Sequence, residues 1–395
     1  MVLHRIYLTP GMFGFARLAS FDYFVHVQHG LERQFADAGQ DLEVHVVDVS
    51  PTASVCRRAA RLAEVVSDTA GDDGPIHLLG HSTGGLDARL VASPGVRLAN
   101  AGAPQRWLPR LRSVTMMNTP HFGTPLAAFF ATSKGQRVLH ALSAFTIIGL
   151  SLGRQPLAVA SMLIEMVGRG DHVIGLELHL MDKLVDSLVG MLDEARSPEV
   201  RAFLDAIKDD QGAVLQVSPE AMELMVAGIA DRPGVVYQST ATMAPTPSVK
   251  KWLGTLLSPW QTTSLTLFTT LHGITSRFDE RYPCAEMSGD PEKGVAFAGE
   301  ATEAMLAQRL GKAPDLLAND GIVPLRSQLW GTLVWAGLGD HLDVLGHYRD
   351  DRPAGGTELP HHDWLTSGSA FGPADFEALM GAVASGMLKA SGRRR

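Results

Sequence analysis

The chain has 395 residues, of which 45% are hydrophobic, so it can bury a large core. Its formal net charge of −8 gives no global preference for nucleic acid, and we expect no nucleic-acid partner. Two cysteines, Cys56 and Cys284, exclude a disulfide framework; one bridge is possible, but reduced thiols are the simpler interpretation. The length fits two or three domains, or one domain with a large insertion.

The chain begins MVLHR and enters a strand pattern at once, without the apolar stretch of a secretory signal. We therefore expect a cytoplasmic location, with a mature secreted form as the alternative. The segment from Trp252 to Ser276 lacks charged residues over a length that could cross a bilayer. Because it contains Pro259, Gln261 and His272 among many Thr and Ser, we expect no transmembrane span.

Strand and helix patterns alternate along the first third of the chain. Predicted strands occupy residues 3–8, 44–49, 76–79 and 114–117, and predicted helices occupy residues 24–38, 55–66 and 86–91. Ser54 is the expected N-cap of the second helix. Continuous apolar strands that alternate with helices indicate a mostly parallel sheet covered by helices on both faces.

The alternation breaks after residue 124. Helical patterns rich in Met, Leu and Ala follow, at residues 156–167, 176–192 and 219–229. The strand pattern resumes at 235–240, a second, irregular excursion covers 243–318, and a last strand is predicted at 332–335. We therefore expect an α/β core of residues 1–124 and 234–395, with a helical cap or lid inserted at 125–233.

The sequence Gly80-His81-Ser82-Thr83-Gly84 lies between a predicted strand and a predicted helix. A tight turn in this context exposes a serine beside a base, and the flanking glycines let the strand and helix approach each other. A glycine-rich turn without chemistry is the alternative interpretation of these five residues. In the strand–turn–helix context, Ser82 is a candidate nucleophile.

A serine nucleophile needs a histidine base and an acid that orients this base. Asp320 lies in a turn after the second excursion, and His341 follows the last predicted strand. The chain order Ser, Asp, His is the order found in α/β-hydrolases. We prefer this pair over the rival candidates, which are His121, His347, His361, His362, Asp315 and Asp343. His361 and His362 are expected at the surface.

The tetrahedral intermediate of acyl transfer needs N–H donors for its oxyanion. One donor is expected to be the backbone N–H of Thr83, which follows the nucleophile. The other is expected from the loop after the first strand, where Gly11 allows a sharp bend and the N–H of Met12 is the candidate. A plain glycine-rich loop is the alternative. Phe13, His81 and His121 are our candidate substrate-binding residues.

Five motifs in this order resemble those of bacterial true lipases of the α/β-hydrolase superfamily. They are GMFGF at 11–15, GHSTG at 80–84, NTPHFGTP at 118–125, NDGIVP at 319–324 and DHLD at 340–343. The resemblance implies an α/β-hydrolase fold with Ser82 as nucleophile, Asp320 as acid and His341 as base. It also implies Met12 and Thr83 as the oxyanion hole.

The chain departs from this family pattern in its oxyanion loop. Such lipases usually have His-Gly where this sequence has Pro10-Gly11, which puts the substrate range in doubt. In similar lipases an acidic residue two positions after the catalytic histidine helps to bind structural calcium, which points to Asp343. The alternative is a local cap or salt bridge at Asp343. No cofactor is expected to be required, and the zinc pattern of some thermophilic lipases is absent from the sequence.

The expected function is hydrolysis of a carboxylic ester or lipid through an acyl-enzyme. The same triad could serve as a polyhydroxyalkanoate depolymerase, phospholipase, thioesterase or acyltransferase. A non-catalytic binding protein is the third possibility. The run Val138–Gly153 and the helix that carries Met222, Leu224 and Met225 are candidates for a cap that contacts a lipid interface, with ordinary helical core as the alternative.

Overall fold

The computed structural model describes most of the chain. The described residues are 2–12, 17–18, 21–98, 105–132, 135–136, 139, 143, 186, 189–190, 192, 194, 197–247, 259–277, 300–350, 361, 363 and 365–392. Phe13, Cys284 and His362 lie outside them.

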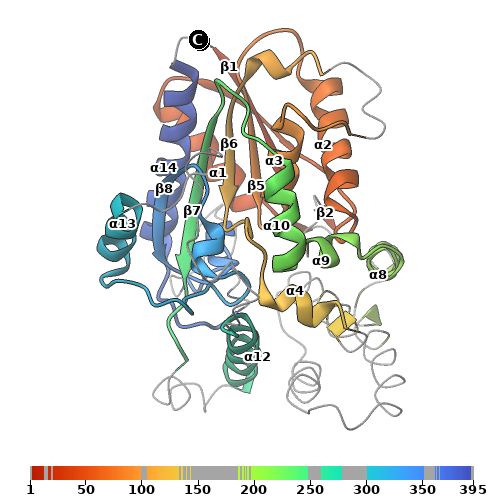
Figure 1. The fold of residues 1–395 in the computed structure, drawn as a ribbon, viewed down its shortest axis with the longest axis vertical. Coiled ribbons are helices and arrows are strands. Elements are labelled where there is room, and N and C mark those ends of the chain that lie inside the picture. Colours follow the sequence, from red (N-terminus) through yellow and green to blue (C-terminus); the bar gives the residue numbers. More distant parts are fainter. Residues whose placement is uncertain are drawn as a thin grey trace.

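Six strands form one sheet in the order β4-β1-β5-β6-β7-β8 (Figure 1). Their bounds are β1 Leu3–Thr9, β4 Asp41–Val46, β5 Ile76–His81, β6 Leu111–Met117, β7 Val236–Met243 and β8 Thr332–Leu338. Every neighbouring pair is parallel, which confirms the predicted parallel sheet. A separate short ribbon pairs β2 (Arg17–Leu18) antiparallel with β3 (Phe21–Asp22).

Helices cover both faces of this sheet, as Figure 1 shows. On one face, α14 (Pro373–Gly392) contacts β6, β7 and β8 and packs against α1 (Val25–Asp37). On the other face, α2 (Val55–Thr69) and α3 (Thr83–Ala92) pack together over β1 and β5. Because both faces are covered, all six residues of β5 are buried.

The edge strand β4 begins three residues earlier than the sequence pattern predicts. It pairs from Asp41 opposite Leu3 to Val46 opposite Leu8. Residues 47–49, which we expected to continue the strand, fall beyond its end, although Val47 N still donates to Leu8 O at 2.9 Å. The apolar run therefore covers the end of the strand and the start of the following loop. Ser54 caps α2 as predicted, since its hydroxyl accepts from the N–H of Arg57.

The described part of residues 125–233 is helical. It contains α4 (Pro125–Phe130), α8 (Ser197–Asp209), α9 (Gly212–Gln216) and α10 (Pro219–Gly228). Of the predicted cap segments, 156–167 and nearly all of 138–153 and 176–192 lie outside the described residues. The helix predicted at 219–229 is confirmed as α10, whereas the boundaries of a separate cap domain stay a prediction.

The second excursion is not irregular, contrary to our expectation. It contains α12 (Pro259–Thr275) and, after residues that the structure does not describe, α13 (Glu300–Leu310), which contacts β8. In α12 the hydroxyls of Thr266, Thr269 and Thr270 each donate to the carbonyl four residues earlier, which satisfies these polar groups inside a helix. Among the described residues, no helix is long and apolar enough to cross a membrane.

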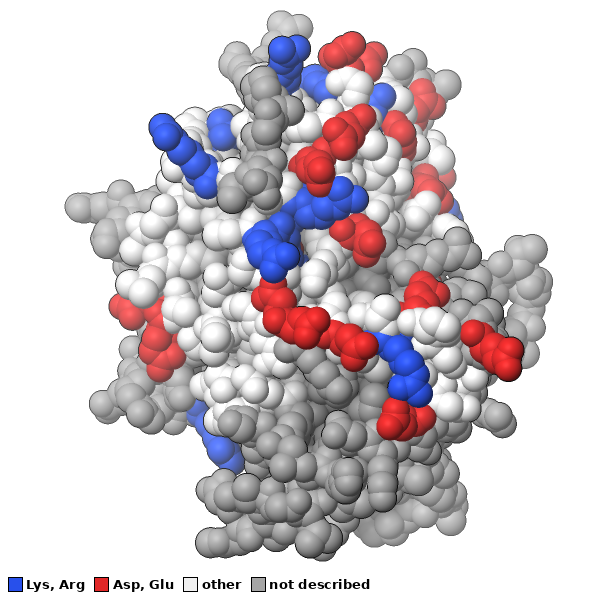
Figure 2. Space-filling model, turned by 90° about the vertical axis from the view of Figure 1, so that its right-hand side faces the viewer, with Lys and Arg blue, Asp and Glu red and all other residues white. Residues whose placement is uncertain are grey.

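Figure 2 shows the face of the molecule that carries α2 and α8. Basic and acidic side chains lie next to each other on this face instead of forming a basic patch. Ion pairs join Arg57 to Asp210, Arg61 to Glu64 and Arg201 to Asp186. On the described part of this face, charges of opposite sign are therefore paired locally.

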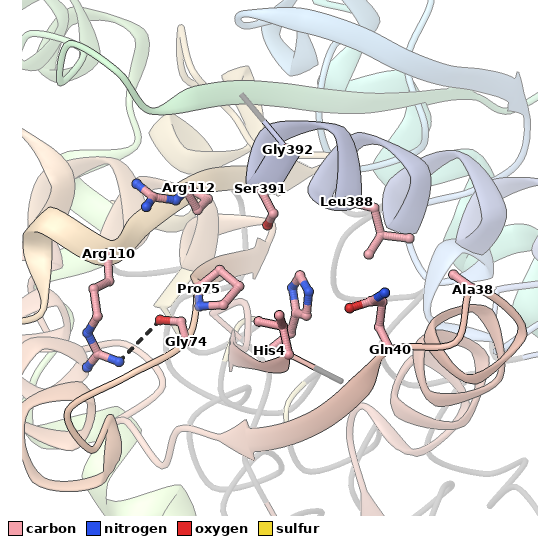
Figure 3. A pocket seen from close by; sticks show the side chains of 11 residues that line it. His4, Ala38, Gln40, Gly74, Pro75, Arg110, Arg112, Leu388, Ser391 and Gly392 are labelled. Carbon is pink, nitrogen blue, oxygen red and sulfur yellow. Dashed lines mark hydrogen bonds between the residues drawn. The ribbon is translucent and has the colours of Figure 1, made fainter. Parts of the chain in front are cut away.

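A cavity of about 660 Å³ lies at the amino ends of the parallel strands. His4, Gln40, Pro75, Arg112, Leu388 and Ser391 contribute to its wall (Figure 3). Arg110 at its edge donates to the carbonyl of Gly74 at 3.2 Å. Ser82 follows the carboxyl end of β5, so the cavity lies at the opposite end of the sheet. Parallel α/β sheets bind their ligands at the carboxyl ends of the strands.

Candidate active site

The candidate nucleophile occupies a strained turn between β5 and α3. Ser82 has φ +54° and ψ −127°, and it separates His81 at the end of β5 from Thr83 at the start of α3. Its N–H donates to the carbonyl of Met117 on the next strand at 2.8 Å. A positive φ in a residue other than glycine costs of the order of 1–3 kcal/mol and persists only where the surroundings impose it.

Two glycines make this turn possible. A Cβ on Gly80 would lie 2.1 Å from the carbonyl carbon of Gly84, and one on Gly84 would lie 2.1 Å from the carbonyl oxygen of Thr9. Both obstacles are backbone atoms, so they cannot move aside as a flexible side chain would. The close approach of strand and helix that the sequence predicts is therefore confirmed.

The candidate acid and base are in direct contact. His341 Nδ1 donates to Oδ2 of Asp320 at 2.7 Å, and the backbone N–H of His341 donates to the carbonyl of Asp320 at 3.0 Å. Asp320 is completely buried, and its Oδ1 accepts from the N–H groups of Ile322 and Val323 at 2.9 and 2.7 Å. With the proton of the neutral imidazole on Nδ1, Nε2 is the nitrogen that can accept a proton.

Asn118 is a site residue that the sequence reasoning included only within a motif. It follows the last residue of β6 with φ +49°, a conformation that asparagine tolerates better than most residues. Its Nδ2 donates to Oδ2 of Asp320 at 3.1 Å and to the hydroxyl of Thr242. An asparagine at the carboxyl end of a buried strand, in a parallel sheet, is the signal that could have identified it.

The loop after β1 lies against the nucleophile. A Cβ on Gly11 would lie 2.8 Å from Cβ of Ser82, so only glycine allows this approach. Met12, the candidate oxyanion donor, follows Gly11 and is 8% exposed. Thr83, the second candidate donor, is the first residue of α3, where backbone N–H groups have no partner within the helix.

Arg58 on α2 connects this loop to the nucleophile helix. Its guanidinium donates to the carbonyl of Pro10, to Pro51 O at 2.8 Å and to Oδ2 of Asp87 on α3 at 2.9 Å. Burial raises the pKa of Asp87 to about 6, although Arg58 acts in the opposite direction. Both residues were missed by the sequence reasoning. A charged residue at a position that the helical spacing turns toward the core is the signal that could have identified Arg58.

His81 lies behind the nucleophile and is 1% exposed. Its ring nitrogens contact the hydroxyl of Tyr23 at 2.8 Å and the carbonyl oxygen of His341 at 2.9 Å. Burial and the neighbouring His341 lower the pKa of His81 well below its usual value. Both ring nitrogens of His81 are thus hydrogen-bonded inside the protein. The predicted contact of His81 with substrate would therefore have no free ring nitrogen to use.

His121 lies in a buried cluster behind α3 and does not approach Asp320 within hydrogen-bond distance. Its Nδ1 accepts from Arg89 at 3.0 Å, and the Arg89 guanidinium lies 3.4 Å over the ring of Trp330. Burial, with a further contribution from Arg89, lowers the pKa of His121 well below its usual value. His121 is fully buried in this cluster, so its predicted role in substrate binding stays a prediction without a described contact.

Two other rival histidines, His347 and His361, pack against His26. His361 is half-buried, so it is only partly at the surface as expected, and its ring stacks on His26 at 4.2 Å and on Tyr348 at 4.4 Å. Its Nδ1 donates to the carbonyl of Gly346 at 2.7 Å. His347 is 2% exposed and packs edge-on against His26.

Asp343, the calcium candidate, makes local hydrogen bonds. Its Oδ2 accepts from the N–H of Asp340 and from the hydroxyl of Ser369, both at 2.8 Å. Burial and the neighbouring Asp340 raise its pKa well above the usual value. Calcium needs six to eight oxygen ligands, and the described residues include no cluster of three or more candidate metal ligands. These residues do not make a calcium site by themselves, so calcium at Asp343 stays a prediction.

The order of the strands and the position of the elbow define the class of fold. Ser82 follows the third strand of the sheet in spatial order, and Asp320 and His341 come from the segments before and after β8. This arrangement is the α/β-hydrolase fold, as predicted.

The chain resembles bacterial lipases in sequence. It is 39% identical to a triacylglycerol lipase of Vibrio cholerae over 92 residues, which cover 23% of this chain and 28% of that protein. It is 30% identical to a triacylglycerol lipase of Pseudomonas fragi over 147 residues, which cover 35% and 44%. The chain thus matches less than half the length of these curated relatives. No family model matches it.

Solved structures of similar fold come from bacterial esterases and lipases. EstA from Clostridium botulinum has a TM-score of 0.48 at 16% identity, over 93% of this chain and 86% of that chain. Lipase 1 from Pelosinus fermentans has a TM-score of 0.47 at 15% identity, over 93% and 98%.

Proposed function

We propose that the protein is a serine hydrolase that cleaves carboxylic esters, including lipid esters, through an acyl-enzyme. The observation that carries this proposal is the 2.7 Å contact between His341 and the buried carboxylate of Asp320, beside the strained turn at Ser82. The rings of His341 and His81, the residue before the nucleophile, lie 4.7 Å apart, so the base is next to the turn. The partial sequence similarity to triacylglycerol lipases supports the choice of ester bonds.

In the proposed mechanism, Oγ of Ser82 attacks the ester carbonyl while Nε2 of His341 takes the hydroxyl proton. Asp320 holds the Nδ1–H tautomer and stabilises the imidazolium that forms. The N–H groups of Met12 and Thr83 donate to the oxyanion of the tetrahedral intermediate. The imidazolium then protonates the leaving alcohol, and water attacks the acyl-serine with His341 again as the base. The bond from the acyl carbon to Oγ breaks, His341 returns the proton to Ser82, and the carboxylic acid leaves.

The exposed side chain of Leu224 supports a contact between α10 and a lipid surface. Leu224 is 77% exposed, although Met222 on the same helix is completely buried. A large apolar side chain exposed on a helix can insert into the edge of a lipid layer. Replacement of Leu224 by serine should weaken binding to phospholipid vesicles while leaving hydrolysis of soluble esters unchanged.

The decisive experiment compares Ser82→Ala with Ser391→Ala on p-nitrophenyl esters of increasing acyl length. Ser391 is a suitable control because its hydroxyl also lies near a histidine, 3.3 Å from His77, but at the opposite end of the sheet. We expect Ser82→Ala to lose hydrolysis and fluorophosphonate labelling, and Ser391→Ala to keep both. Wild-type rates in Ser82→Ala would exclude the proposed nucleophile. Turnover of a thioester, phospholipid or polyester in preference to simple esters would redefine the substrate.

A further inference from the structure

Two side chains outside the proposed triad join the oxyanion loop to the loop of the base. The Tyr23 hydroxyl lies next to the backbone of Gly11, where a Cβ on this glycine would be 3.3 Å away, and it lies 2.8 Å from Nδ1 of His81. On the other side of the same ring, Nε2 of His81 lies 2.9 Å from the carbonyl oxygen of His341. Two hydrogen bonds therefore connect Tyr23, beside Gly11 in the oxyanion loop, to the proposed base.

The chemistry of these groups fixes the direction of each hydrogen bond. A carbonyl oxygen can only accept, so Nε2 of His81 carries the proton and donates to His341. Nδ1 of the neutral ring must then accept, and the Tyr23 hydroxyl donates to it. The hydroxyl oxygen of Tyr23 keeps its lone pairs on the side of Gly11, where it can accept from a backbone N–H. Each donor of these two hydrogen bonds has an acceptor.

Burial keeps both side chains neutral, as these two hydrogen bonds require. Tyr23 is 6% exposed and His81 is 1% exposed. Burial raises the pKa of the Tyr23 hydroxyl and lowers the pKa of the His81 imidazole, and the charge of His341 lowers the latter further. His81 thus stays neutral even while His341 carries a proton during the reaction.

The hydrogen bond from His81 also helps to fix the backbone of His341, because both backbone polar groups of this residue then have partners. The N–H of this residue donates to Asp320 O at 3.0 Å, and its carbonyl accepts from His81. Its ring is fixed through Nδ1 by the Asp320 carboxylate at 2.7 Å. The three bonds leave the imidazole little freedom to turn Nε2 away from Ser82.

We propose that Tyr23 and His81 are positioning residues that hold the oxyanion loop and the proposed base in a fixed relation around Ser82. This inference rests on the proposed function. Both residues act through the backbone of Gly11 and His341. Their loss should therefore weaken stabilisation of the transition state more than binding of the substrate, because donors aimed at developing charge act mainly in the transition state.

The first test is Tyr23→Phe, which removes only the hydroxyl. We expect kcat on a soluble p-nitrophenyl ester to fall about 3- to 10-fold, as one net hydrogen bond allows, with KM unchanged within about twofold. The rate at which a phosphonate ester labels Ser82 should fall by a similar factor. Tyr7→Phe is the matched control, since it removes a buried hydroxyl 2.9 Å from Thr69 that lies away from the site.

The second test separates the two nitrogens of His81. His81→Gln can retain a donor near the position of Nε2, whereas His81→Leu removes both polar atoms. We expect His81→Gln to keep more of the wild-type kcat than His81→Leu. His77→Gln is the control, because His77 is also completely buried on β5 but contacts His4 and Ser113 toward the opposite end of the sheet.

A measurement on the wild-type protein keeps the inference testable if a variant does not fold. Nitrogen-15 NMR of labelled histidine should show His81 as the neutral Nε2–H tautomer from pH 6 to 8. The Nδ1–H tautomer, or an imidazolium in this range, would overturn the proposed hydrogen bonds. Equal kcat in Tyr23→Phe and Tyr7→Phe, or a loss confined to KM, would also overturn it. If Ser82→Ala remained active, the proposed function would be wrong. The tautomer of His81 would still show whether its hydrogen bonds to Tyr23 and His341 have the proposed directions.

Discussion

The Arg58 guanidinium lies 2.8 Å from the Asp87 carboxylate, and neither side chain is exposed to solvent. The two residues come from α2 and α3, and Arg58 also donates to the carbonyl of Pro10 in the candidate oxyanion loop. A buried ion pair adds little net stability, because the cost of desolvation offsets much of the attraction. Its main effect here is geometric, since it ties the loop before Met12 to the helix that begins after Ser82.

The pKa of Asp87 leads to a prediction about stability. Burial raises the pKa of Asp87 from 3.8 to about 6, so the carboxyl of Asp87 binds a proton more tightly in the folded protein than in the unfolded chain. The resulting stabilisation is fully present below about pH 4 and is lost as the pH rises through 6. Asp87→Asn cannot titrate, so its stability relative to wild type should improve between pH 4 and 7. Urea unfolding at several pH values measures this trend.

The control for this measurement is Asp68→Asn, because Asp68 is exposed on the same side of the sheet, on α2. We expect its effect on stability to change little over the same pH range. If the relative stability of Asp87→Asn fell instead as the pH rose, the attraction of Arg58 would outweigh burial and the pKa of Asp87 would be lowered.

The glycines of the elbow lead to a second prediction. In Gly80→Ala the new methyl group would meet the backbone of Gly84 and Gly85 at 2.1 and 2.2 Å. We expect a loss of roughly 3 kcal/mol or more, or no soluble protein, because packed backbone cannot yield. Gly95→Ala, whose Cβ meets open space, should change stability by less than about 0.5 kcal/mol. Thermal unfolding and soluble yield compare the two variants, and equal behaviour would contradict the close approach.

Asn118 gives a prediction that separates strain from function. Asn118→Gly keeps a backbone suited to φ +49° but removes the amide that donates to Asp320. Asn118→Ala removes the same amide and adds about 1–2 kcal/mol of backbone strain. We expect both to lower kcat about tenfold and only the alanine variant to unfold at a clearly lower temperature. A wild-type rate in Asn118→Gly would show that Asp320 is positioned without the amide.

Asp320→Asn tests the proposed acid. The asparagine NH₂ would face donors, because the carboxylate it replaces accepts from His341, Ile322 and Val323. The imidazole would lose its preferred tautomer, and we expect kcat to fall about 10⁴-fold with the fold retained, as in other serine triads. Circular dichroism and initial rates measure the two effects. Asp315→Asn, exposed five residues earlier, should behave as wild type.

Features that depend on neighbouring residues could be predicted from the sequence. The parallel sheet follows from continuous apolar strands that alternate with helices, and the elbow follows from glycines spaced around Ser82. The contact between Asp320 and His341 could be anticipated from their order and their place after strands. These signals are local, or they rest on a rule of chain order that the fold imposes.

The supporting residues of the site could not be predicted in this way. Tyr23, Arg58 and Asn118 reach it from three separate segments; local spacing indicates that Arg58 and Asn118 are buried, but it does not identify the groups they contact. The helix α12 was missed for another reason: its Thr and Ser residues favour other structures, and burial of Phe268 and Leu271 outweighs that preference. In both cases tertiary contacts determine what the local sequence leaves open.

The insertion between β6 and β7 has a consequence for how the chain folds. These strands are neighbours in the sheet, yet residues 118–235 separate them in sequence. Their pairing must close a long loop, and the entropy cost of this closure comes before any stabilising contact between them forms. We therefore expect the unit from β1 to β6 to form early and β7 and β8 to dock late. Until then β6 is an open edge strand with a row of unpaired backbone groups. Newly made chains should therefore be most prone to aggregate in this interval, and a chaperone that covers β6 should raise the yield of native protein.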